Sequence, residues 1–454
     1  MEKNKFEIDM CNGPIMSKLI SFSVPLILSG MLQLMFNAVD IIVVGQFSGS
    51  TSLAAVGSTT ALINVFVNLF MGISLGANVV SARCYAMGRR EEMSKTVHTA
   101  ITIALVSGII MAVIGVIFAK GALLLMGTPE NVINLSTLYM RIYFLGMPFF
   151  MLYNYGAAIL RAVGDTKRPL IFLVISGCIN AGINMLLVIV FDMGVAGVAI
   201  GTVISQFVSC ALVINCLYRT TSSYQLRFSK LKIEKDYMIQ IFQVGVPAGI
   251  QSTVINFSNA LLQSSVNSFG SVAMAGYTAA NNVLGFLYVS VNSITQACMS
   301  FTSQNYAVGK HKRMDRVLID CMVLSISVAL ILGGGAYLFG TYILNIYTSD
   351  ADVIKCGLEI LSITTVPYFF CGIMDLFPGA LRGMGYSTIP MILSIIGTVG
   401  IRILWIFVFF PMHRSLYFLF ISYPGSWIAT IVMQVICYML VRKKIASQGT
   451  LSND

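Results

Sequence analysis

The chain has 454 residues, of which 57% are hydrophobic and only 10% are charged, and its formal net charge is +10. Soluble domains carry about 25% charged residues, so this composition excludes an ordinary soluble protein and indicates an integral membrane protein. The apolar runs are about 20 to 30 residues long, which fits membrane-spanning helices and excludes a barrel of short alternating strands. The cysteines lack metal-ligand spacing and mostly lie in apolar runs, so we expect small core residues.

Taken in chain order, the apolar runs predict twelve membrane spans that are separated by polar turns. The expected spans are approximately 15–45, 53–82, 97–119, 132–158, 169–191, 195–217, 237–267, 273–303, 317–340, 352–380, 388–410 and 416–441. The longest polar segment divides them into an expected N-terminal lobe over 1–218, a cytoplasmic linker over 219–236 and a C-terminal lobe over 237–454. The first polar residues lack a cleavable signal peptide, so we expect the first span to stay as a membrane anchor.

The basic residues lie mainly on one side of this expected arrangement. If the termini and the even-numbered turns share a side, that side holds 23 of the 28 lysines and arginines, and the opposite side holds three. Such a bias places both termini in the cytoplasm. The net charge then reflects topology signals near anionic lipid, so we expect a multi-pass plasma-membrane protein that contacts the bilayer and binds no nucleic acid.

Two pairs of segments repeat at a shift of 221 residues. Tyr85–Arg89 corresponds to Tyr306–Lys310, and Leu160–Pro169 corresponds to Leu381–Pro390. Four prolines fall in nearly the same register, as the pairs Pro25 with Pro247 and Pro148 with Pro367. The halves therefore read as duplicated units, each with six spans and the same topology. We expect an all-α membrane fold of two six-helix bundles, related by a pseudo-two-fold axis along the membrane normal, with a site between them.

The first span carries an acid well inside its apolar run. Gln33, Asn37 and Asp40 are spaced at i, i+4 and i+7, so a helix places all three on one face. A charge at the bilayer centre costs from about 3 kcal/mol upward, which makes Asp40 a candidate functional residue. The alternative is a neutral acid that forms hydrogen bonds between packed helices. Aromatic and thioether side chains that could form a deformable cavity wall are Met35, Phe36 and Tyr153.

Several other spans carry amides and hydroxyls at helical spacing. Such stripes either join helices, each hydrogen bond contributing about 1 kcal/mol, or line a water-filled cavity. Because at least five spans carry them, a shared polar cavity explains them best together. Candidate cavity residues in the C-terminal half are Asn256, Gln263 and Asn281. Asp375 is the second deep acid and a further candidate; alternatively, it is a partner for Arg402 or for a backbone amide near Pro378.

Enzyme motifs are missing from the sequence. It contains no HExxH, GxSxG or Walker A motif and no hydrolytic constellation of paired carboxylates, and its three histidines are scattered. We therefore expect a protein that is not an enzyme and needs no cofactor. Without a nucleotide site, a pump built from this chain would have to use an ion gradient.

The duplicated halves, the segment Asn37–Gly45 and the Leu-Arg-x-x-Gly turns after the fourth and tenth spans resemble the multidrug and toxic compound extrusion (MATE) family. The resemblance covers nearly the whole chain. It implies two six-helix lobes that form a V-shaped cleft with alternating access, and a protein that we expect to be monomeric. The implied activity is export of cationic and amphipathic organic compounds by proton or sodium antiport.

The resemblance also implies a cation site in the N-terminal lobe. Its residues would be Asp40, Asn180, Asn184 and Thr202, and for Na⁺ coupling Asp40, Asn180 and Thr202 would bind the ion. Many members carry an acid where this chain has Asn184. The seventh span has Ile255 and no acid where another branch carries a glutamate, which favours the DinF-like branch; Asp375 lies about one turn from an acid of that other branch.

The mechanism expected from these residues is alternation of Asp40 between a cation-bound or protonated state and a state that favours the substrate. Two other functions remain open. A lipid-linked oligosaccharide flippase of the same superfamily would need a cationic cavity, and only Arg141 and Arg402 lie deep within spans. The other alternative is a channel or receptor. The internal duplication and the cavity-lining acids favour a transporter over a receptor, and a single-channel recording would identify a channel.

Overall fold

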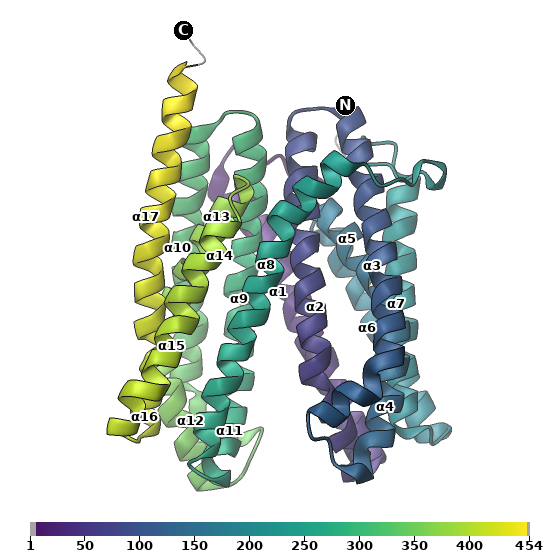
Figure 1. Cartoon of the computed structure of the whole chain (residues 1–454), viewed down its shortest axis with the longest axis vertical. Coiled ribbons are helices and arrows are strands. Elements are labelled where there is room, and N and C mark those ends of the chain that lie inside the picture. Colours follow the sequence, from purple (N-terminus) through teal and green to yellow (C-terminus); the bar gives the residue numbers. More distant parts are fainter. Residues whose placement is uncertain (1–5, 452–454) are drawn as a thin grey trace. The chain divides into compact units, whose positions relative to one another are not determined.

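The computed structural model describes residues 6–451, and within this range it contains helices and no strand. Figure 1 shows the course of these helices along the chain. The elements of the first half are α1 (Ile15–Phe47), α2 (Gly49–Ala86), α3 (Arg90–Leu125), α4 (Glu130–Leu145), α5 (Met147–Ala162), α6 (Lys167–Met185), η1 (Leu186–Val190) and α7 (Gly194–Arg219). Those of the second half are η2 (Phe228–Lys230), α8 (Lys235–Asn267), α9 (Ser271–Ala307), α10 (His311–Leu338), α11 (Gly340–Asn345), α12 (Ala351–Thr364), α13 (Tyr368–Gly383), α14 (Thr388–Ser394), η3 (Ile395–Gly400), α15 (Ile401–Leu404), η4 (Trp405–Phe409), η5 (Phe410–Met412), α16 (Leu416–Phe420) and α17 (Ser422–Leu451).

The described helices confirm the all-α membrane fold that the composition predicts. Ten of them, in the part of the chain that the structure describes, are long and apolar enough to cross a membrane. Two bent pairs also qualify: α4 with α5, bent by 45°, and α12 with α13, bent by 50°. Counting each pair as one span gives the expected twelve. The bends lie beside Pro148 and Pro367, where a missing backbone N–H and a fixed φ interrupt the helix.

Helix boundaries repeat at the shift of 221 residues that the turn sequences show. Four pairs of helices begin 221 residues apart: α3 and α10 at Arg90 and His311, α4 and α12 at Glu130 and Ala351, α5 and α13 at Met147 and Tyr368, and α6 and α14 at Lys167 and Thr388. The glycines of the repeated Leu-Arg-x-x-Gly turns, Gly164 and Gly385, have φ angles of 95° and 89°. Only glycine adopts this left-handed conformation without strain, so both copies of the helix end in the same way.

The chain packs as two compact units, and two helices contribute residues to both of them. One unit comprises the chain up to Met10 together with Val24–Gly249, and the second comprises Cys11–Ser23 together with the chain from Ile250 onward. Helices α1 and α8 therefore change unit partway along. Each changes within about two residues of a proline inside the helix, Pro25 and Pro247 respectively. These packing units differ from the lobes expected from the repeat, which remain a prediction.

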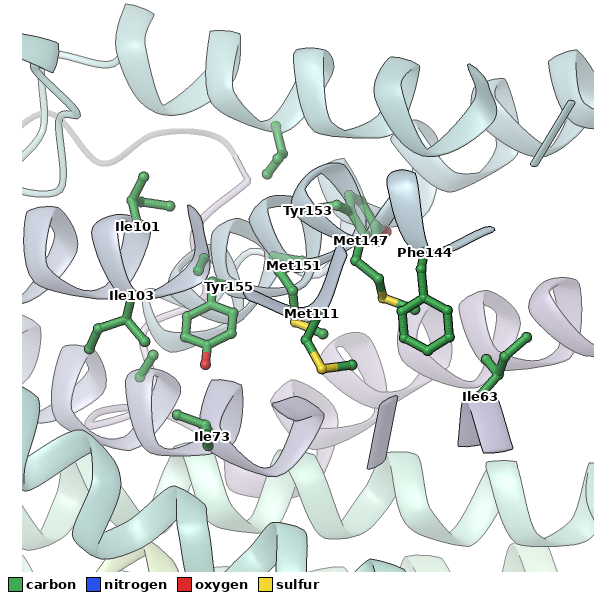
Figure 2. Packing of buried hydrophobic residues seen from close by; sticks show 14 of the residues in the cluster. Ile63, Ile73, Ile101, Ile103, Met111, Phe144, Met147, Met151, Tyr153 and Tyr155 are labelled. Carbon is green, nitrogen blue, oxygen red and sulfur yellow. The ribbon is translucent and has the colours of Figure 1, made fainter. Parts of the chain in front are cut away.

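The core of the first unit is a continuous cluster of aromatic, thioether and aliphatic side chains. Figure 2 shows Phe144, Met147, Met151 and Tyr155, all fully buried, within this cluster. The ring of Phe144 lies against Gly115, where a Cβ atom would come within 2.0 Å of the ring. Within a membrane such close van der Waals packing replaces the hydrophobic effect as the force between helices. The second unit has a separate core that includes Tyr368 and Trp427, whose ring centroids lie 5.4 Å apart.

Candidate functional site

The carboxylate of Asp40 accepts a hydrogen bond from an amide on a helix that is distant in sequence. Asp40 lies in the part of α1 that belongs to the first unit, and its side chain is half-buried. Asn184 of α6 donates from Nδ2 to Asp40 Oδ1 at 2.5 Å, and the same nitrogen lies 3.4 Å from Oδ1 of Asn180. Asn180 and Asn184 are four residues apart, so both lie on the α6 face toward this carboxylate. Hydrogen bonds to ionised groups are among the stronger ones in proteins.

Two glycines allow the helices to approach closely at this point. A Cβ atom at Gly201 of α7 would lie 1.9 Å from Oδ1 of Asn184. A Cβ atom at Gly177 of α6 would lie 1.9 Å from the ring of Phe36 on α1. Any side chain at either position would therefore displace the amide or the ring. The geometry around Asp40 depends on these two missing side chains.

The side-chain amide oxygen of Asn184, Oδ1, is a buried acceptor with no hydrogen-bond partner among the residues that the structure describes. The whole side chain is 0% exposed. A buried polar atom without a partner costs about 1–3 kcal/mol, so a site that holds one usually serves a ligand or a switch. A small cation beside the Asp40 carboxylate would give this oxygen a partner. The residues present therefore fit a proton or a monovalent metal ion.

The charge of the site fits a single positive charge. Within the described range no three His, Cys, Asp or Glu side chains form a metal-binding group. The site accordingly offers one carboxylate together with neutral oxygens. The hydroxyl of Thr202 on α7 lies close enough to interact with Asp40, although its hydrogen bond goes to the carbonyl of Val198 at 2.9 Å.

Two tyrosines near Asp40 are missing from the set predicted from the sequence. Tyr139 and Tyr143 of α4 lie within electrostatic range of the Asp40 carboxylate, and their rings stack with centroids 6.1 Å apart. Their spacing of four residues on an apolar helix was the available signal, but the same spacing is common in ordinary cores. The site is thus built from α1, α4, α6 and α7.

The other predicted residues of the first unit are placed as follows. Three of them on α1 are exposed: Gln33, Met35 and Asn37. Tyr153 lies in the core with 8% exposure, and its hydroxyl donates to the carbonyl of Pro169 at 3.2 Å. Pro169 precedes Asn180 by eleven residues, or about 16 Å along a helix. The structure therefore does not bring Tyr153 beside Asp40.

The predicted residues of the second unit do not gather around one group. Three amides there are exposed: Asn256, Gln263 and Asn281. Asp375 of α13 has no hydrogen bond or ion pair within residues 6–451, and its nearest interacting charge is Arg382, which donates to Gln251 at 2.6 Å. The alternative expectation that Asp375 pairs with Arg402 or with a backbone amide is wrong, because Arg402 binds the amide oxygen of Asn259 instead.

Comparisons with known proteins agree with the duplicated transporter plan. The MatE family model matches the chain twice, over residues 25–186 and 247–408. A relative from Bacillus subtilis (strain 168), "Probable multidrug resistance protein YoeA", is 29% identical over 433 residues and covers 93% of each chain. "Multidrug export protein MepA" from Staphylococcus aureus (strain MSSA476) is 22% identical over 398 residues, with 87% of each chain covered.

A solved structure described as "Outward-facing conformation of a multidrug resistance MATE family transporter of the MOP superfamily" has the same fold. Its TM-score is 0.89 at 18% identity, and the match covers 99% of this chain and 100% of that one. The expected resemblance to the MATE family and the expected fold class are both confirmed. With both halves matched by one family model, the chain belongs to the MatE family, whose members are membrane transporters and not enzymes.

Proposed function

We propose that the protein exports small organic compounds, chiefly cations and amphipathic molecules, in exchange for H⁺ or Na⁺. The observation that carries this proposal is the Asp40–Asn184 pair, in which a half-buried carboxylate lies beside an amide oxygen without a partner. The negative charge and the free acceptor oxygen of this pair would attract a small cation within a membrane span. Relatives named for multidrug resistance and multidrug export support the direction and the substrate class.

The proposed mechanism couples the charge of Asp40 to substrate release. In the outward-facing state an entering cation neutralises the carboxylate, and the oxygens of Asn180, Asn184 and Thr202 provide further contacts. If the ion is Na⁺, Asp40, Asn180 and Thr202 bind it. Neutralisation removes the attraction for a cationic substrate and favours a rearranged α1, whose Pro25 lies where the helix changes unit.

The wider arrangement completes the proposal. Two six-helix lobes alternate access around a cleft, both termini face the cytoplasm of a plasma-membrane protein, and the monomer is the working unit. The bias of the basic residues supports the orientation. The expected seventh span, 237–267, contains no acid and has Ile255 in place of a family glutamate, which supports assignment to the DinF-like branch that couples through the first lobe.

The test is ethidium efflux from proteoliposomes that contain the purified protein, with a pH gradient and a Na⁺ gradient imposed separately. Asp40→Asn keeps the size of the side chain and removes its charge, so gradient-driven efflux should fall by about tenfold or more. Asp192→Asn is the matched control, because Asp192 is exposed in a turn with φ 51°, a conformation that asparagine tolerates. Efflux at the wild-type rate in the Asp40 variant would refute the coupling role.

The same vesicles separate the alternative functions. Transport that follows one gradient names the coupling ion. No transport by the wild-type protein under either gradient would favour a lipid-linked oligosaccharide flippase, which can be assayed with a fluorescent lipid-linked sugar. Unitary currents in a planar bilayer would favour a channel, since an antiporter produces none.

A further inference from the structure

A second polar cluster lies inside the second unit and is centred on Arg402. This residue belongs to α15, near the middle of the 25-residue apolar span Thr388–Met412, and its side chain is 3% exposed. Its Nη1 donates to Oδ1 of Asn259 on α8 at 2.8 Å, and its Nε donates to the hydroxyl of Ser426 on α17 at 3.3 Å. Its guanidinium lies 4.2 Å from the ring centroid of Tyr423.

The charge of this arginine is not neutralised by any acid within residues 6–451. All of its direct partners are neutral, and the acid Asp375 interacts with Arg382 instead. A guanidinium has five N–H groups, and only two of those of Arg402 have an acceptor among the described residues. A buried charge without a counter-charge costs several kcal/mol, and more so near the middle of a membrane span. Such a group calls for an anion.

The cluster lies on the helices of the second unit that correspond to α1, α6 and α7, which carry the Asp40 site in the first. A shift of 221 residues converts Thr202 into Tyr423, Ser205 into Ser426 and Ala181 into Arg402. In the register of Pro25 and Pro247, which is a shift of 222, Asn37 becomes Asn259. The corresponding helices are therefore used in both units, but the charge at the centre is inverted.

Local helix geometry sets both places apart from the rest of the spans. Wide π-helical turns immediately precede and follow α15, as η3 and η4, and the π-helical η1 begins two residues after Asn184. Such turns are rare and occur often at functional sites, because they change the direction of side chains without breaking the helix. In each unit they adjoin the polar cluster.

We propose that Arg402, held by Asn259, Ser426 and Tyr423, is a binding site for a monoanion, either free chloride or the carboxylate of a transported compound. The planar guanidinium has enough free N–H groups to hold a carboxylate through two parallel hydrogen bonds. The substrate source rests on the export function proposed above and extends it to zwitterionic compounds. The free-anion source is independent of that function.

The protein contains its own reporters for this site. Its two tryptophans, Trp405 and Trp427, both adjoin the cluster: Trp405 begins η4 directly after α15, and Trp427 follows Ser426. The ring of Tyr423 lies 5.6 Å from that of Trp427 while it also contacts Arg402. An anion that shifts the guanidinium will therefore change the intrinsic fluorescence of the full-length protein in detergent.

The first arm of the test titrates chloride against methanesulfonate at constant sodium concentration and follows this fluorescence. The second arm compares binding of a rhodamine dye with a free carboxylate to binding of its methyl ester, by fluorescence anisotropy. Arg402→Gln should weaken the affected binding by about tenfold or more. Arg414→Gln is the control, because it removes an exposed positive charge from the turn after the same span.

The outcomes distinguish the two sources. A saturable chloride response that Arg402→Gln abolishes assigns the site to free anion, and a preference for the carboxylate dye that the variant abolishes assigns it to substrate. If Arg402→Gln does not fold, Arg402→Lys keeps the charge and should retain anion binding but lose the carboxylate preference. Absence of both responses in the wild-type protein overturns the proposal. Since neither arm uses a gradient, failed efflux leaves this result unaffected.

Discussion

Replacing Gly201 by alanine should disable the Asp40 site without touching any polar group. The new Cβ would lie 1.9 Å from Oδ1 of Asn184, whereas ordinary contacts begin at 3.4 Å. The amide therefore has to move by about 1.5 Å. Such a movement breaks a hydrogen bond that is 2.5 Å long between Asn184 and Asp40. Hydrogen bonds to charged groups contribute about 1.5–3 kcal/mol, so coupled efflux should fall by roughly 10- to 150-fold.

Gly182→Ala is the matched control for this substitution. Gly182 lies on α6, two residues before Asn184, and a Cβ atom there would meet nothing within 4 Å. Because alanine favours a helix over glycine by about 1 kcal/mol, this control should be at least as stable as the wild type and transport normally. Ethidium efflux from proteoliposomes, normalised to reconstituted protein, compares the two.

A double variant tests whether the effect of Gly201→Ala passes through Asn184. Asn184→Ala alone removes the side-chain amide, so adding Gly201→Ala to it leaves an ordinary contact with the backbone nitrogen of residue 184 at 3.4 Å. The double variant should therefore transport at the rate of Asn184→Ala, with the two effects strongly non-additive. Normal efflux by Gly201→Ala would refute the close packing of α6 and α7, and additive losses would refute the role of Asn184 as intermediary.

Two further predictions concern stability and can be measured by thermal unfolding. Burial raises the pKa of Asp165 in the turn after α5 although Arg168 opposes this, so the folded state binds the proton more tightly than the unfolded chain. The contribution of this carboxyl to the free energy of unfolding therefore falls as the pH rises above 3.8 through its folded pKa. Asp165→Asn should flatten the pH dependence, whereas Asp192→Asn should leave it unchanged. Separately, Gln251→Leu removes the acceptor of Arg382 and should destabilise the fold by about 1.5–3 kcal/mol, and the same change at exposed Gln263 should have little effect. Equal melting temperatures for the two leucine variants would contradict the importance of that hydrogen bond.

The repeat and the number of spans could be predicted because the helix ends that mark them depend on local turn chemistry, although the expected bounds differ from the helices by several residues, as for 97–119 against Arg90–Leu125. Gly88 and Gly309 end corresponding helices with φ angles of 69° and 72°, and both follow a tyrosine three residues earlier. A glycine just after an apolar run is a recognisable sequence signal for the end of a helix. The shift of 221 residues between such marks then predicts where α10, α12, α13 and α14 begin.

The contacts of the site were less predictable because they depend on which turns of separate helices lie side by side. The face of α1 that carries Asp40 follows from helical spacing, but its contact with Asn184 was expected only from the family resemblance. Helical spacing alone cannot show that Tyr139 approaches this carboxylate or that Tyr153 donates to Pro169 instead. Close glycine contacts such as that at Gly201 fix this register, and they involve residues distant in sequence.

Charge matching was also a poor guide in the second unit. Asp375 and Arg402 carry opposite charges in adjacent spans, so the sequence alone suggests an ion pair. In the structure, Asn259 of α8 accepts a hydrogen bond from Arg402, while Asp375 interacts electrostatically with Arg382, two turns farther along α13. An amide can satisfy the geometry of one N–H group without neutralising the guanidinium. The positive charge of Arg402 therefore remains uncompensated, which is why we propose an anionic ligand for this cluster.

The central charged residue is negative in the first unit and positive in the second. After a duplication, replacing one side chain in each unit is enough to change the sign of the charge that the unit can bind. In both units side chains from three corresponding helices meet inside a span, and Thr202 and Ser205 correspond to the hydroxyl residues Tyr423 and Ser426. In the register of Pro25 and Pro247, which is a shift of 222, Asp40 corresponds to Leu262, and at the shift of 221 residues Arg402 corresponds to Ala181. One charged side chain in each unit thus decides the sign of the ion or group that can be held there. A compound with a carboxylate would give Arg402 a counter-charge, whereas a simple cation would leave Arg402 without one, so the carboxylate and ester dyes should separate in affinity only while Arg402 is present.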